Sequence, residues 1–144
     1  MAEQLFAWCS NAAIAAWLGL GCAAALGPGP WRERLLFVAG RAVPLALCLV
    51  YVLVLVGYWG TAPGGGFTSL ASVLLLFAAP GKMLGGWLHF LAFDLLVGHW
   101  MVQTVVERNL SRWPLLLFLP LAFLWGPMGL LGFTGWLVGG RRGR

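Results

Sequence analysis

The sequence predicts an all-α integral membrane protein, and three observations lead to this fold class. Hydrophobic residues make up 61% of the 144 residues and charged residues only 9%, whereas soluble domains carry about 25% charged residues. The mean hydropathy is +0.90. Several apolar stretches reach the length of about 20 residues that a helix needs to cross a bilayer. We therefore expect one helical bundle within the membrane and no separate soluble domain.

The expected bundle is a single transmembrane domain that covers residues 1–144 and holds four transmembrane helices. Their expected ranges are 5–26, 35–58, 84–107 and 115–138. A shorter apolar stretch, 67–79, lies between a Gly-rich loop and Pro80. At this length we expect a short re-entrant or interfacial helix. The alternative is five spans, which the positive-inside rule favours because most Lys and Arg residues then fall on one side of the membrane.

Proline residues mark where the expected helices end or bend. The run from Gly27 to Pro30 ends the first span. Pro44 should kink the second span. Pro127 lies near the middle of the last span, where its missing N–H removes one backbone hydrogen bond. We expect the last helix to bend at Gly126 and to leave room beside the acid of the 84–107 helix.

The stretch 84–107 carries Asp94 at its centre, with His89 and His99 on either side. A carboxyl group near the centre of a membrane helix costs about 2.5 kcal/mol or more on insertion scales. Such a residue faces protein or water rather than lipid, and it indicates a functional site. Tyr51 and Pro127 fall at a similar depth, so a buried acid, a phenol and a broken helix predict a small site for an apolar ligand.

Helical geometry separates the three polar residues of this stretch. At about 100° per residue, His89 and His99 each lie about 140° from Asp94 around the helix axis, and about 15 Å from each other along it. One straight helix cannot bring them onto one metal ion. The three cysteines lie in apolar runs without metal-binding or redox spacing and are expected to pack as small apolar residues. We predict no metal-ion cluster, and the residues indicate no cofactor with certainty. A haem ligand from His89 or His99 is an open alternative that the spacing does not support.

A second reading of Asp94 is structural. In that reading its carboxylate only joins helices by accepting hydrogen bonds from Tyr51, Asn11 or a tryptophan. Asn11 is the one strongly polar residue within the first span, so it is either a helix contact or a ligand contact. Three tryptophans are candidates for the lining of a ligand site, and they are Trp87, Trp100 and Trp125.

The central stretch from Gly86 to Trp100, GWLHFLAFDLLVGHW, resembles the GWxHYLAFDLFVGRW motif of the abscisic-acid-deficient-four-like membrane proteins. The GPMGLL sequence that begins at Gly126 is similar to the GPxGLL of that family. The resemblance covers nearly the whole chain. Two positions depart from the motif, because His99 replaces an arginine and Phe90 replaces a tyrosine. If these two side chains touch the ligand, the substrate differs from that of the plant members.

The resemblance implies a carotenoid or another isoprenoid pigment as the ligand, since plant members are needed to make neoxanthin from violaxanthin. It implies a neoxanthin-synthase-like or carotenoid isomerase activity, by isomerisation or epoxide rearrangement, with Asp94 as the proton carrier and His89 as a second one. The expected catalytic residues are Asp94 and His89. The expected ligand-binding residues are Asn11, Tyr51, Trp87, Phe90, His99, Trp100, Trp125 and Pro127.

The competing hypothesis is a non-catalytic, pigment-binding accessory subunit of a larger membrane complex, for instance a photosynthetic one. The short loops and the lack of a transit peptide are typical of a bacterial member, which predicts the bacterial inner membrane or a photosynthetic membrane. The net charge of +5 suits anionic membrane lipid. No basic run with interleaved aromatic residues indicates nucleic-acid binding.

Overall fold

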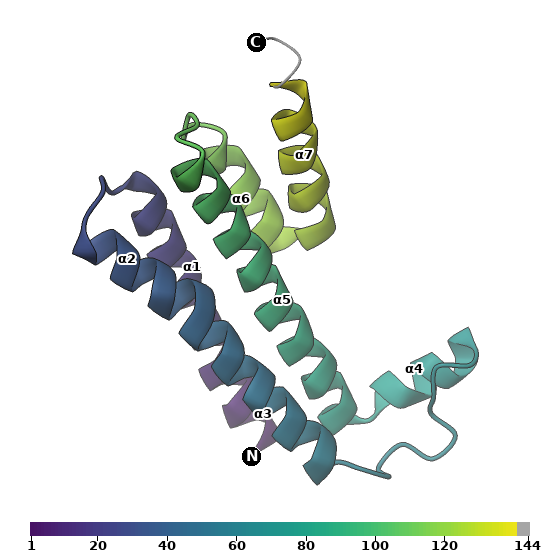
Figure 1. The fold of residues 1–144 in the computed structure, drawn as a ribbon. Coiled ribbons are helices and arrows are strands. Elements are labelled where there is room, and N and C mark those ends of the chain that lie inside the picture. The colour runs from purple at the N-terminus through teal and green to yellow at the C-terminus, as the bar shows by residue number, and fades with distance from the viewer. Residues whose placement is uncertain (141–144) are drawn as a thin grey trace.

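The computed structural model describes residues 1–140, and these fold into helices without a strand among them (Figure 1). The all-α fold class is confirmed. The elements in chain order are α1 (Ala2–Ala25), α2 (Pro30–Phe37), the π-helical turn η1 (Val38–Ala42), α3 (Val43–Gly57), α4 (Leu70–Ala78), α5 (Pro80–Glu107), α6 (Leu115–Leu124) and α7 (Gly126–Gly139).

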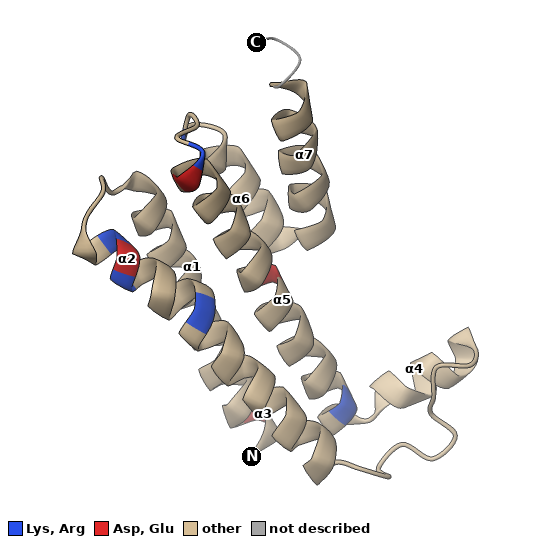
Figure 2. Ribbon diagram, viewed as in Figure 1, with Lys and Arg blue, Asp and Glu red and all other residues tan. Residues whose placement is uncertain are grey.

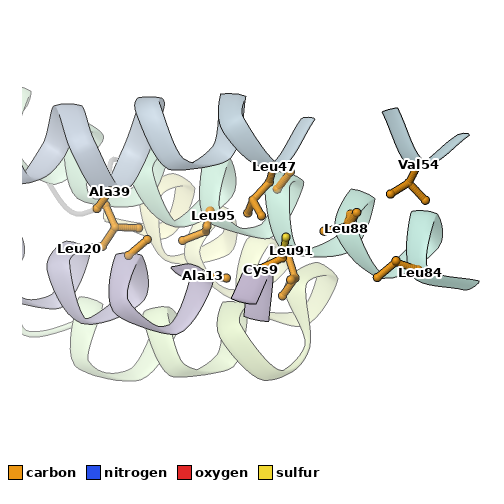
Figure 3. Packing of buried hydrophobic residues seen from close by; sticks show 12 residues of the cluster. Cys9, Ala13, Leu20, Ala39, Leu47, Val54, Leu84, Leu88, Leu91 and Leu95 are labelled. Carbon is orange, nitrogen blue, oxygen red and sulfur yellow. The ribbon is translucent and has the colours of Figure 1, made fainter. Parts of the chain in front are cut away.

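Within residues 1–140, three helices are long and apolar enough to cross a membrane. They are α1 with 24 residues, the continuous helix Pro30–Gly57 with 28, and α5 with 28. Figure 1 shows α5 at the centre of the molecule, with α1 and α3 along one side of it and α6 and α7 on the other. Leucines and small residues of α1, α3 and α5 interlock in the main core, which includes Leu20, Leu47, Leu88 and Leu95 (Figure 3). The structure is that of a membrane helical bundle.

The second span contains a π-helical turn directly before Pro44. A proline cannot donate a hydrogen bond to the carbonyl four residues earlier, so the regular ladder is interrupted there. The N–H of Val43 donates to the carbonyl of Val38, five residues back, and the helix continues with one wide turn. The irregularity that was expected at Pro44 therefore lies in the turn that precedes it.

The short helix α4 does not cross the bundle. Gly81 at the start of α5 lies against the ring of Tyr58 at the end of α3, so closely that a Cβ at Gly81 would collide with that ring. The chain between these residues therefore leaves and re-enters the bundle at the same end. Ser69 caps α4 by accepting the N–H of Ser72, and no residue of α4 is buried. The expected short helix is present, and the chain does not make the alternative fifth span there.

The expectation that residues 115–138 form a fourth continuous span is wrong. This segment consists of two short helices, α6 and α7, which fold back on each other at Trp125 (Figure 1). A Cβ at Gly129 would lie 2.7 Å from the Cβ of Ala122, and the rings of Phe118 and Trp136 lie 6.5 Å apart. In one straight helix residues 118 and 136 would be about 27 Å apart. The segment is a hairpin that enters the bundle and returns to the end from which it came.

The described basic residues lie mainly at one end of the bundle. Arg32, Arg34, Arg108 and Arg112 lie at one end, which we call the basic end, with Arg41 about two helical turns deeper. Figure 2 shows basic residues on α2 and at the neighbouring end of α5. Lys82 is the described basic residue of the opposite end, where α4 lies. Arg141, Arg142 and Arg144, which enter the five-span count, lie outside the described residues.

The positive-inside rule then predicts that the basic end faces the cytoplasm. We expect a membrane-impermeant maleimide to label Thr68→Cys in intact cells and Ser111→Cys only after permeabilisation, both in a background without the native cysteines. The two positions are exposed hydroxyl-bearing residues at opposite ends of the bundle, so each is a control for the other. Labelling of both variants from the same side would contradict the arrangement of α5 and its flanking loops.

Candidate functional site

Asp94 lies at the middle of α5, and its side chain is buried, with 9% of its surface exposed. The helix repeat places Trp87, Phe90 and Leu91 on the same side of α5, because residues three, four and seven positions apart share a face. These side chains line a groove of about 320 Å³ between α1, α5 and α6. The acid therefore lies in an aromatic groove at the depth where a bilayer is most apolar.

The other walls of the groove come from α1 and α6. Its remaining lining residues are Ser10, Ala13, Ile14, Trp17, Phe123 and Leu124. The Nε1–H of Trp87 donates a hydrogen bond of 3.0 Å to the Oγ of Ser10, which ties α5 to α1. Trp17 meets the ring of Phe123 edge to face at 5.6 Å. The groove is walled mainly by flat rings, and Asp94 is the one titratable residue among those that line it.

The break between α6 and α7 places the start of a helix at the carboxyl group of Asp94. A Cβ at Gly126 would collide with that carboxyl group, so only glycine permits this close approach. The first turn of a helix has free N–H groups and carries a partial positive charge, which favours an acid. Pro127 occupies the first turn of α7, where its missing N–H costs nothing. The bend expected at Gly126 is confirmed, and it is a complete reversal of the chain.

The hydrogen bonds of the described residues do not support the purely structural reading of Asp94. Its Oδ2 atom is buried and has no hydrogen-bond partner. Asn11 is exposed on α1. The indole N–H of Trp87 donates its hydrogen bond to Ser10 and not to Asp94. A buried polar atom without a partner costs about 1–3 kcal/mol. A ligand that forms a hydrogen bond with this oxygen would recover that free energy.

The structure places the other predicted site residues in separate surroundings. His89 is exposed, stacks on Phe93 at 4.5 Å and lies 5.9 Å from the ring of Tyr51 on the α3 side of α5. Trp100 meets Phe133 of α7 at 5.2 Å. These groups lie on other faces than the one that carries Asp94.

The remaining predicted site residues also lie apart from one another in the structure. His99 is buried against Gly40 of η1, on the far side of α5 from the groove. Trp125 and Pro127 form the tip of the hairpin, and both are exposed. Of the ten predicted site residues, the groove therefore brings together Asp94, Trp87 and Phe90, with Pro127 at the helix start beside them.

Sequence reasoning missed the α1 and α6 walls of the groove. A signal existed on α1, where Ser10, Ala13, Ile14 and Trp17 recur at the spacing of one helix face. Phe123 and Leu124 directly precede the break, but nothing in their spacing shows that the chain reverses after them. Their position follows from the hairpin, which is a tertiary feature.

The fold and the groove define a class of protein: a small helical membrane protein with a buried acid at the start of a broken helix. The comparison with protein families gives a match to the model of the ABA DEFICIENT 4-like family over residues 4–133. The chain belongs to this family. No curated protein and no solved structure gives a significant match. The matched residues include α5, the groove and the tip of the hairpin, which agrees with the resemblance of the GWLHFLAFDLLVGHW and GPMGLL motifs.

Proposed function

We propose that the protein binds a carotenoid or a related isoprenoid pigment in the groove and converts it by isomerisation or epoxide rearrangement, with Asp94 as the proton carrier. The observation that carries this proposal is the unpartnered, buried carboxyl oxygen of Asp94 in an otherwise apolar, aromatic groove. Family membership supports the choice of pigment, because the family name refers to a deficiency in abscisic acid, which plants derive from carotenoids.

The shape of the groove suits a long, flat molecule. A second hollow of about 290 Å³ follows the same α1–α5 seam and is lined by Glu3, Phe6 and Leu84. Trp87 lines both hollows, so they meet at its ring. The distance along α5 from Pro80 to Asp94 is about 21 Å. A conjugated chain lying in this seam would have one end at the membrane surface near Glu3 and an inner part at Asp94.

The proposed chemistry needs no oxidant, reductant or metal ion. In an epoxide rearrangement, the neutral carboxyl of Asp94 gives its proton to the epoxide oxygen and the C–O bond breaks. The electron pair of that bond stays on the oxygen, and the cation is spread over the conjugated chain. Loss of a proton from a neighbouring carbon to the carboxylate forms the new double bond and restores the acid. One carboxyl group therefore suffices, and His89, on the α3 side, would act only as a secondary proton carrier.

Blocking the groove tests the proposal. Ile14 lines the groove and is about half exposed, so Ile14→Trp should fill it without disturbing the buried core. We expect this variant to lose bound pigment, measured from the absorption spectrum of the purified protein, and to lose conversion of added carotenoid. The matched control is Leu18→Trp, on the same helix but 68% exposed and outside the groove. Equal pigment content in both variants would refute the groove as the binding site.

The second candidate function is pigment binding without chemistry, as an accessory subunit of a larger membrane complex such as a photosynthetic one. The specific observation in its favour is that the groove offers a single titratable group, whereas many acid–base enzymes use two. In that case the purified protein carries pigment and a partner but converts no carotenoid. For both functions we propose the bacterial inner membrane or a photosynthetic membrane as the location, because the groove can take up its ligand directly from lipid.

A further inference from the structure

A second pocket lies on the opposite face of α5, near the basic end. It has a volume of about 340 Å³ and is formed between α2, η1 and α5. Its polar lining includes Arg32, Arg41, His99, Gln103 and Glu107. The helix repeat places His99 about 140° around α5 from Asp94, so this pocket is separate from the pigment groove and the inference drawn from it does not depend on the proposed function.

The π-helical turn makes room for His99 at the inner end of the pocket. Gly40 of this turn lies directly against the imidazole ring, and a Cβ at Gly40 would collide with the ring. The His99 side chain is 9% exposed, and both of its ring nitrogens are buried without a hydrogen-bond partner. A polar ring held so tightly between helices is fixed in place before any ligand arrives.

A third unpartnered nitrogen of the pocket lining belongs to Arg32 and is a hydrogen-bond donor. The Nε of Arg32 is buried and has no partner. Glu107 accepts a hydrogen bond of 2.6 Å from Gln103, so its carboxylate is engaged on its own helix. Glu33 lines the pocket from an exposed position at the rim. The pocket lining thus contains nitrogens of Arg32 and His99 that make no hydrogen bond within the protein, with the positive charge of Arg41 beside them.

We propose that this pocket binds a phosphate group, and specifically the phosphodiester of an anionic membrane lipid. Phosphate oxygens are strong acceptors, and guanidinium groups match them in both charge and geometry. Leu36, Phe37 and Val106 form an apolar part of the same lining, where the first carbons of an acyl chain can pack. The position near the basic end, predicted to face the cytoplasm, is the level at which lipid phosphates lie.

The test measures lipid binding to the purified full-length protein after delipidation in detergent. Phosphatidylglycerol is added, and the bound fraction is followed by native mass spectrometry. We expect one tightly bound phosphatidylglycerol on the unaltered protein, and about tenfold weaker binding to Arg41→Gln, because one charged hydrogen bond is lost. Arg41 is exposed, so its replacement leaves the core intact. His99→Leu, which removes both ring nitrogens and keeps an apolar side chain of similar size, should also weaken binding.

The matched control is Arg34→Gln. Arg34 is an exposed arginine of α2 whose guanidinium lies over the ring of Trp31 at 5.4 Å, outside the pocket. The Arg34→Gln variant should bind phosphatidylglycerol as tightly as the unaltered protein does. Diacylglycerol with the same acyl chains separates phosphate recognition from chain packing, and glycerol 3-phosphate shows whether a soluble phosphate ester suffices. Displacement of the lipid by glycerol 3-phosphate would support recognition of the phosphate group by this pocket and show that a soluble phosphate ester also binds there. The proposal would be overturned if diacylglycerol bound as tightly as phosphatidylglycerol. It would also be overturned if Arg34→Gln and Arg41→Gln weakened phosphatidylglycerol binding equally.

Discussion

Asp94→Asn should abolish conversion of a carotenoid substrate while the protein still folds and binds pigment. The amide has nearly the shape of the carboxyl group and can still lie against Gly126 at the start of α7. It cannot give a proton to an epoxide or a polyene. General acid–base catalysis contributes about 10²–10⁴-fold to a rate, so we expect the conversion rate to fall by at least about 100-fold. The measurement is chromatographic separation of substrate and product after incubation with protein in detergent or liposomes.

The pigment content of the Asn variant is the internal control for this experiment. If pigment content is normal and conversion is lost, the carboxyl group is the proton carrier. Conversion that persists in the Asn variant would show that another group carries the proton. Absence of conversion by both forms, with pigment bound to both, would indicate the accessory-subunit function. The groove variant Ile14→Trp differs in that it should lose binding and conversion together.

The sequence predicts the break of the last helix, but not the direction that the chain takes after it. The missing N–H of Pro127 interrupts the helix whether the chain then bends slightly or reverses. The outcome depends on which surfaces pack. Ala122 and Gly129 are small enough for α6 and α7 to touch along their length, and the ring of Phe118 then packs against α7. Hydropathy alone counts these residues as one apolar stretch and therefore gives four spans.

The candidate site could be predicted along one helix but not between helices. Asp94, Trp87 and Phe90 share a face of α5 by the repeat of the helix, and the same repeat correctly separates His89 and His99 from Asp94. The helix repeat can indicate which face of α1 is used, but the register between α1 and α5, which brings Ser10 to Trp87, depends on side-chain packing. The contacts of Tyr51 and Asn11 could not be predicted for the same reason, since a shared depth does not specify a shared side of α5.

Of two Gly→Ala substitutions in α7, one should destabilise the protein and the other should not. The first is Gly129→Ala, whose Cβ would overlap the backbone of Ala122 and force α6 and α7 apart. Overpacking typically costs about 1–3 kcal/mol, and here rigid backbone atoms are the obstacle. The second is Gly135→Ala, whose Cβ would meet no atom within 4 Å. In a helix interior Ala is favoured over Gly by about 1 kcal/mol, so this variant should be equally or more stable.

The pair isolates the close packing of the hairpin, because both substitutions have the same intrinsic helix preference and lie on the same helix. Thermal unfolding in detergent should therefore give a lower midpoint for Gly129→Ala than for the unaltered protein, and an equal or higher one for Gly135→Ala. Because the hairpin holds Gly126 against Asp94 and Phe123 against Trp17, Gly129→Ala should also lose bound pigment at temperatures where it remains folded. In a continuous fourth span residues 122 and 129 would be about 10 Å apart, and the two variants would then behave alike.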